Sequence, residues 1–161
     1  MMIRKHLPAA AAALVALSLY LLWLWQPERQ VRLHTSHFLK SVERRNWNSV
    51  QNFLADDYTD RWQHNKESAV GDAREAFRQF MFVTIENRID SCEMAGDQAT
   101  ARAVIKISGS GGVVAQLVME RVNTLSGPFT FAWRKASWKP WDWQLTRVDH
   151  PQLSTGHFEG F

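Results

Sequence analysis

The chain has 161 residues, which is enough for one domain of ordinary size plus a short segment and too few for two full domains. Apolar residues make up 45% and charged residues 22%, a composition that is typical of a globular protein and excludes a disordered chain. The formal net charge is +3, but without Arg4 and Lys5 the chain carries 17 basic against 16 acidic side chains, which argues against nucleic-acid binding driven by bulk charge.

The first predicted element is an uncharged run over residues 7–25, preceded by a basic tail over residues 1–6. At 1.5 Å per residue, a helix of this length just crosses roughly 30 Å of hydrocarbon. A cleaved signal peptide is the alternative, and it would need small residues at its C-terminal edge, where this run instead reads Leu-Leu-Trp-Leu-Trp. The sequence therefore predicts a transmembrane helix over residues 7–26 that acts as an uncleaved signal anchor.

The flanks of this run set the expected orientation. Tyr20, Trp23 and Trp25 are residue types that lie at the headgroup level, and Pro27 ends the helix just beyond them. The basic tail favours a cytoplasmic N-terminus, although two arginines after the helix reduce the charge asymmetry. We therefore expect a single-pass protein of a bacterial inner membrane that contacts the membrane through residues 7–25 and holds its domain on the non-cytoplasmic side.

Two helices are predicted next. Apolar residues at helical spacing between Val31 and Val42 predict an amphipathic helix that stops near Asn46. Asn48 followed by Gln51 is the pattern of an N-cap with its reciprocal partner, which predicts a second, short helix.

The hydrophobic period changes along the second half of the chain. Residues 58–63 alternate briefly, as in a short strand, and Asp72 with Glu75 opens a third helix. Beyond it, five runs rich in β-branched and aromatic residues predict strands at residues 83–89, 101–107, 113–122, 129–134 and 141–148. The predicted fold class is therefore α+β, with three N-terminal helices packed on a curved antiparallel sheet and a flexible tail over residues 151–161.

Three motifs carry a resemblance to a known family. They are Phe38-Leu39-x-x-Val42-x-x-Arg45-Asn46-Trp47, Phe53-Leu54-Ala55-Asp56-Asp57-Tyr58 and Trp143-Gln144-Leu145-Thr146-Arg147-Val148-Asp149. With the order of the elements, they make residues 28–150 resemble the nuclear transport factor 2-like (NTF2-like) superfamily, in particular its SnoaL-like branch. The resemblance implies a cone closed by a bent sheet, often with a pocket at its wide end and often paired as a dimer through the sheet. It implies little about activity, because such folds host isomerases, dehydratases, hydrolases, dimerisation modules and cargo binders.

The resemblance also points to a catalytic position. The ketosteroid-isomerase branch places an aspartate base a few residues after the acidic pair at 56–57, and that position falls at or beside Trp62. An indole cannot abstract a proton. Asp60 and His64 are the candidate catalytic residues nearby.

Other site patterns are also present. An Asp-Arg-Asp set of the limonene-epoxide-hydrolase type could use Asp90, Arg102 and Asp142, but their spacing gives no reason for these side chains to converge. The side chains expected to line a pocket of the cone are Tyr58, Trp62, Phe77, Arg102 and Trp133. We expect no metal and no cofactor, because the histidines are scattered, Cys92 is the single cysteine, and the glycine-rich residues 109–112 are expected to join two strands without the helix N-terminus of a phosphate loop.

The densest chemical signal is a group of aromatic residues near the end of the chain: Phe129, Phe131, Trp133, Trp138, Trp141 and Trp143. Stacking of these rings across strands would serve core packing or a homodimer through the sheet. Because the domain is nearly neutral, we expect a homodimer, with a small hydrophobic ligand or a protein as further candidate partners. Nucleic acid is not expected, since no basic stripe accompanies the aromatic residues.

The sequence thus favours a membrane-anchored, non-catalytic ligand-binding or protein-assembly module over an enzyme. The alternative is a SnoaL-like enzyme of the isomerase, dehydratase or hydrolase type that uses a polar pocket. On the first interpretation Trp62 fills the cavity and Trp62→Ala costs roughly 3–5 kcal/mol of stability. On the second, Asp60→Asn removes turnover and leaves stability almost untouched.

Overall fold

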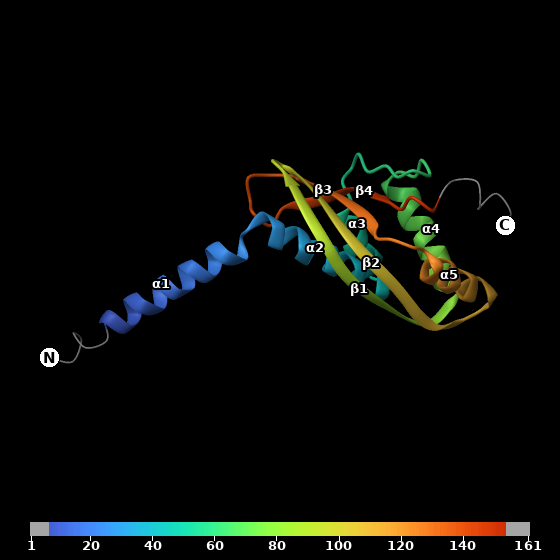
Figure 1. The fold of residues 1–161 in the computed structure, drawn as a ribbon, viewed down its shortest axis with the longest axis horizontal. Helices are drawn as coiled ribbons and strands as arrows, with labels where there is room; N and C mark the ends of the chain where they lie inside the picture. Colours follow the sequence, from blue (N-terminus) through green and yellow to red (C-terminus); the bar gives the residue numbers. More distant parts are fainter. Residues whose placement is uncertain (1–6, 154–161) are drawn as a thin grey trace.

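The computed structural model describes residues 7–153 and has an α+β fold. Its elements are α1 (Leu7–Leu24), α2 (Pro27–Glu43), α3 (Trp47–Phe53), α4 (Lys66–Arg78), β1 (Phe80–Ala95), β2 (Gln98–Gly111), α5 (Val113–Thr124), β3 (Phe129–Lys135) and β4 (Trp143–Asp149). The four strands form one antiparallel sheet in the order β1-β2-β3-β4. Figure 1 shows α1 projecting from one end of the domain, while α4 and α5 lie toward the other end. The predicted basic tail, 1–6, lies outside the described residues, as does all of the predicted flexible tail beyond residue 153.

The N-terminal helix α1 carries no charged residue, and most of its described side chains, from Ala13 onward, are exposed. Over the residues that the structure describes, no helix is both long enough and apolar enough to cross a membrane. The transmembrane helix predicted over residues 7–26 is therefore not confirmed. The structure ends α1 at Leu24, before the predicted boundary at residue 26, and Pro27 is the first residue of α2.

The core lies between α2 and the sheet. Phe131, Trp133 and Leu145 of the sheet are 0–1% exposed and face the buried side of α2. The indole Nε1 of Trp133 donates a hydrogen bond to the Thr35 hydroxyl at 3.0 Å, and both residues are fully buried. Large side chains therefore fill the space between α2 and the sheet.

Residues 113–122, predicted as a strand, form helix α5. Four valines favour a strand by composition, which misleads the prediction. The side chains of this run that pack against the core recur at helical spacing: Ala115, Val118, Met119 and Val122. Residues 109–112 consequently lead from a strand into a helix, with Gly112 as its N-cap, and do not join two strands as expected.

Residues 58–63, predicted as a short strand, form turns. The buried Asp60 side chain accepts hydrogen bonds from the backbone N–H groups of Trp62 and His64 at 2.9 and 3.0 Å. Such bonds from an aspartate to nearby backbone groups stabilise a turn in competition with a strand.

The third predicted helix begins earlier than expected. α4 starts at Lys66, whereas the sequence pattern placed its N-terminus at Asp72. Asn65 is the N-cap, and its side chain accepts from the backbone N–H of Ser68 while the Ser68 hydroxyl accepts from the backbone N–H of Asn65. This reciprocal pair uses serine where the usual capping box has glutamate or glutamine. Asp72 with Glu75 matches the usual pattern, so the helix start was predicted there instead of at Asn65.

Side chains close the outer edge of β1. Three residues from α2 and its C-terminal turn bond to the strand backbone: Arg32 Nη1 donates to Ile89 O (3.2 Å), Glu43 Oε2 accepts from Ile85 N (2.9 Å) and Arg45 Nη2 donates to Phe80 O (2.7 Å). At the opposite edge of the sheet, residues 54–59 run beside β4 and donate two backbone hydrogen bonds to it.

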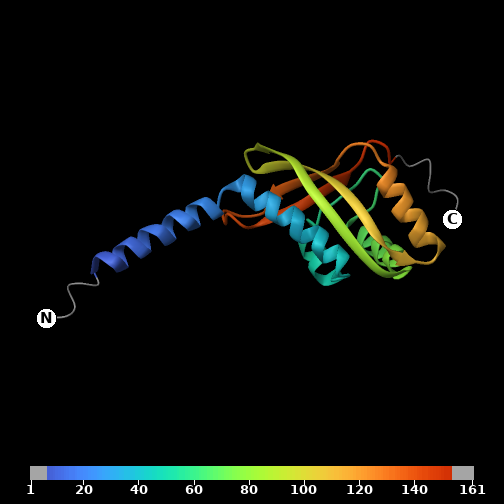
Figure 2. The same ribbon diagram turned by 60° about the horizontal axis from the view of Figure 1, so that its bottom comes forward.

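The second half of β2 is closed in a related way. β3 pairs only with residues 98–103 of β2, so the remainder of that edge faces α5 (Figure 2). The Asn123 amide donates to Ile107 O at 2.7 Å and accepts from Ile107 N at 2.9 Å. One side chain thereby provides both hydrogen bonds that a neighbouring strand would have made with Ile107.

Candidate functional site

The two candidate catalytic residues lie together in the loop between α3 and α4. Asp60 Oδ2 is 2.9 Å from His64 Nδ1, and His64 Nε2 is 3.1 Å from Asp72 Oδ2 on α4. The Asp60 side chain is 4% exposed, whereas the His64 and Asp72 side chains are 32% and 70% exposed. The structure thus produces a carboxylate–imidazole–carboxylate series, and the part of Asp72 in it was not predicted from the sequence.

This series has the residue types of an acid–base relay, but the Asp60 carboxylate already takes part in three hydrogen bonds. Both ring nitrogens of His64 face carboxylates, and Asp60 Oδ1 accepts the two backbone N–H groups that shape the loop. A general base needs an unoccupied nitrogen or oxygen within hydrogen-bonding reach of its substrate. The geometry therefore favours a structural role in which Asp60 holds the loop before α4.

None of the expected pocket-lining residues lines either of the two surface depressions described below. Tyr58 is buried beside Asp60, and burial together with that carboxylate raises the pKa of its hydroxyl. Phe77 is buried elsewhere, against Trp47 and Phe80. The remaining three residues lie in different surroundings. Trp62 is half-buried, Arg102 is half-buried and paired with Glu93, and Trp133 is in the core.

The Asp-Arg-Asp alternative does not converge either. Arg102 pairs with Glu93, and Asp90 pairs with Arg88 on the same strand. Asp142 lies in the loop between β3 and β4, next to Trp143. Among the described residues, no ion pair joins Arg102 to Asp90 or to Asp142.

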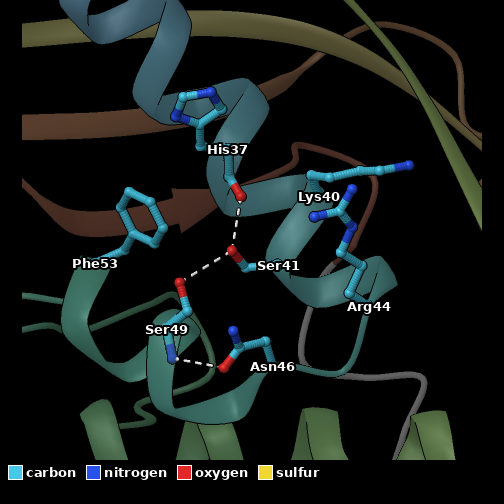
Figure 3. A pocket seen from close by; sticks show the side chains of 7 residues that line it. All are labelled: His37, Lys40, Ser41, Arg44, Asn46, Ser49 and Phe53. Carbon is cyan, nitrogen blue, oxygen red and sulfur yellow. Dashed lines mark hydrogen bonds between the residues drawn. The ribbon is translucent and has the colours of Figure 1, made fainter.

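Two surface depressions lie along α2 and α3. One has a volume of about 330 Å³ and is lined by His37, Lys40, Ser41, Arg44, Asn46, Ser49 and Phe53 (Figure 3). The Ser41 hydroxyl bridges the His37 carbonyl oxygen and the Ser49 hydroxyl at 2.9 and 3.1 Å, which joins α2 to α3 across its floor. His37, Lys40 and Arg44 recur at i, i+3 and i+7 along α2 and its C-cap, so they share one face of the helix.

A second depression of about 250 Å³ lies beside the first. It is lined by His34, Ser49, Asn52, Phe53, Trp141, Asp142, Trp143 and Gln144. Burial lowers the pKa of the His34 imidazole, whose Nδ1 lies 2.8 Å from Gln30 O. Both depressions are open to solvent and are lined by polar and apolar groups alike, so they suit contact with the surface of a partner more than enclosure of a hydrophobic substrate.

The aromatic group of the last strands divides into two sets. Phe131, Trp133 and Trp143 are buried in the core, where they stabilise the sheet. Trp138 and Trp141 lie in the β3–β4 loop, residues 136–142, and are 84% and 49% exposed. The Trp141 ring is 6.0 Å from that of Trp25 at the end of α1. Because the buried rings of Phe131, Trp133 and Trp143 face the helices, these three rings are not available for a dimer through the outer face of the sheet.

Comparison with solved structures identifies the fold. A conserved protein from Planctomyces limnophilus matches with a TM-score of 0.61 and 13% identity over 76% of this chain and 93% of that one. An NTF2-like protein of unknown function from Pseudomonas putida matches with 0.55 and 16% over 75% and 82%. A candidate dehydratase of the NTF2-like family from Streptomyces avermitilis matches with 0.56 and 15% over 75% and 91%. No protein-family model matches the chain, and no curated protein matches it significantly by sequence. The described domain therefore has an NTF2-like fold, and identities this low show the fold alone.

Proposed function

We propose that this chain is a membrane-anchored NTF2-like domain that acts as a non-catalytic binding or assembly module. The filled interior carries this proposal, since Trp133 and Phe131 are 1% exposed where an NTF2-like enzyme would need space for a substrate. The two surface depressions also support it, because they are open to solvent and such surfaces suit protein contacts.

The exposure of α1 supports the membrane anchor. Its side chains Leu14, Leu17, Leu19 and Leu22 are 53–64% exposed, although they are among the most apolar in the chain. A helix that is apolar on all sides is stable when lipid or protein surrounds it. The uncharged run and its basic flank favour lipid, with the domain on the non-cytoplasmic side of a bacterial inner membrane.

Fractionation of cells expressing the full chain tests the anchor. We expect the protein in the membrane fraction after alkaline carbonate extraction, with an intact mass that includes residues 7–25. The paired variant Leu17→Lys with Leu19→Lys should release it, whereas Thr84→Lys with Glu86→Lys on the exposed face of β1 should not. A mature chain that begins near Gln26 or Pro27 would refute the anchor.

Self-association through the sheet is part of the proposed assembly role. The outer face of β1 and β2 carries both charge signs, including Glu86, Arg88 and Lys106, which permits complementary pairing of two copies. Sedimentation of the full chain in detergent at micromolar concentration tests this. A dimer that separates on raising the salt concentration is the expected result, and a monomer at low salt would exclude this mode.

The enzyme alternative has one observation in its favour, which is the buried Asp60 beside His64. It is tested with small carbonyl and epoxide substrates on the full chain. Turnover that disappears in Asp60→Asn while the circular dichroism spectrum and melting temperature stay unchanged would establish the enzyme in place of the binding module.

A further inference from the structure

The β3–β4 loop exposes two tryptophans at the end of the domain from which α1 departs. Trp138 is 84% exposed and Trp141 is 49% exposed, while Trp25, just beyond α1, is 38% exposed and the other described tryptophans of the domain are buried or half-buried. Indole rings in water are costly, and adjacent exposed ones mark an interaction surface.

The position of this loop is fixed relative to α1. The rings of Trp141 and Trp25 lie 6.0 Å apart, and Figures 1 and 2 both show the loop beside the junction of α1 and α2. The junction itself is held by Gln30, whose Nε2 donates to Leu24 O at 2.7 Å and whose side chain is buried. The loop therefore lies at the same level as the C-terminal end of α1.

Cationic side chains accompany these rings. Lys139 lies between the two tryptophans in the sequence, and Lys135 precedes the loop. The Arg29 guanidinium stacks over the Trp23 ring at 3.2 Å from its centroid. Two acidic residues are also near: Glu28 is paired with Arg32, and Asp142 is half-buried at the base of the loop. Exposed indoles interleaved with lysine and arginine are the residue set that occupies the headgroup layer of a bilayer.

We propose that the β3–β4 loop is a second membrane contact, with Trp138 and Trp141 seated in the headgroup layer of the same bilayer that holds α1. This inference rests on the proposed anchoring of α1. The occupant is a lipid surface, because the loop continues the band of Trp23, Trp25 and Arg29 at the end of an apolar helix. Two attachment points hold the domain against the bilayer in one orientation.

Fluorescent labels placed in the full chain test this contact. In a Cys92→Ser background, single cysteines are introduced by Lys139→Cys in the loop, Ser126→Cys before the opposite end of β3, and Val15→Cys in α1. Each is labelled with an environment-sensitive dye and reconstituted into phosphatidylcholine–phosphatidylglycerol vesicles with or without a headgroup nitroxide or an acyl-chain nitroxide. The label at 139 should be quenched several-fold more by the headgroup nitroxide than the label at 126.

The controls separate the possible failures. Quenching of the label at 139 should fall when Trp138→Ala and Trp141→Ala are added, and unchanged quenching would overturn the role of the indoles. If the acyl-chain nitroxide quenches the label at 15 while the headgroup nitroxide quenches those at 139 and 126 equally, the loop contact is wrong and the anchor stands. If the label at 15 is not quenched, the proposed anchoring itself fails. A label at 139 that is shielded from aqueous iodide without any headgroup quenching would assign the loop to a protein partner.

Discussion

The hydrogen bond between Trp133 and Thr35 is the main polar contact inside the core. Thr35→Val keeps the shape of the side chain and removes the acceptor, so the buried indole N–H is left unpaired. We expect a loss of about 1–3 kcal/mol in the free energy of unfolding. Thr84→Val on the exposed face of β1 makes the same substitution without a buried bond and should be nearly neutral. Equal unfolding midpoints in urea for the two variants would show that the indole has another acceptor.

Asp60 is expected to matter for stability, in contrast to the almost unchanged stability that the enzyme alternative assigns to Asp60→Asn. Its carboxylate accepts two backbone N–H groups and faces the His64 ring, all at 2.9–3.0 Å. Asp60→Ala leaves these partners unpaired and should cost about 1–3 kcal/mol, measured by thermal unfolding. The comparison variant is Asp56→Ala, whose side chain is 98% exposed in its pair with Lys66 and should contribute little. If both variants melt together, Asp60 does not hold the loop.

His34 should make stability depend on pH. Burial lowers the pKa of His34 in the folded protein, so the unfolded chain takes up a proton at a higher pH than the folded chain. This contribution to stability is complete above about pH 6.5 and is lost as the pH falls from there through the lower folded pKa. The difference in unfolding free energy between about pH 7.5 and pH 5.5 should therefore be smaller in His34→Gln than in the unchanged protein. An identical difference in both would show that other groups cause the dependence.

At the scale of elements, alanine substitutions at two glycines are expected to change the stability of the domain in opposite directions. A Cβ on Gly111 would overlap the Gln79 carbonyl oxygen and lie 2.6 Å from Ala115 Cβ, at the point where β2 passes into α5. Gly111→Ala should therefore destabilise the domain by about 1–3 kcal/mol. Gly71 lies within α4 with nothing within 4 Å of a built Cβ, so Gly71→Ala should stabilise by about 0.5–1 kcal/mol. Calorimetric melting temperatures that move in the same direction would contradict this account.

Elements with a strong local period could be predicted from the sequence. α2 and the strands β1–β4 each bury one face, so their apolar residues recur at a regular spacing that predicts them. The observed bounds of α2 are close to the predicted ones. α5 could not be recovered from composition, because its valines favour a strand while its packing against β2 holds it as a helix. The loop over residues 58–63 depends on one aspartate side chain, and alternation over so few residues does not reveal such a bond.

At the scale of the whole molecule, the candidate site was the least predictable part. Asp60 and His64 were identified as a pair from their nearness in sequence, but Asp72 joins them only because α4 begins at Lys66. The two surface depressions share Phe53 and Ser49 and depend on how α3 packs against α2, which no local pattern encodes. The division of the tryptophans between core and loop likewise depends on where β3 ends.

The closed outer edge of β1 has a measurable role. Arg32→Ala combined with Glu43→Ala removes two of the side chains that bond to its backbone. We expect this variant to aggregate faster on mild heating, because an unpaired strand edge pairs with another chain. Light scattering at equal concentration measures the rate, and the exposed pair Arg78→Ala with Glu75→Ala on α4 is the control. Equal rates would show that α2 does not protect this edge.

These same closed edges limit how any partner can recognise the domain. An extended peptide binds many sheet proteins by β-augmentation, adding itself as one more strand through main-chain hydrogen bonds. In the described part of the chain, α2 side chains occupy the β1 side, residues 54–59 the β4 side and Asn123 the open half of β2. A partner must therefore contact side chains on a face of the sheet or in a loop. Its binding then depends on individual side chains, and mutation can alter these contacts one residue at a time.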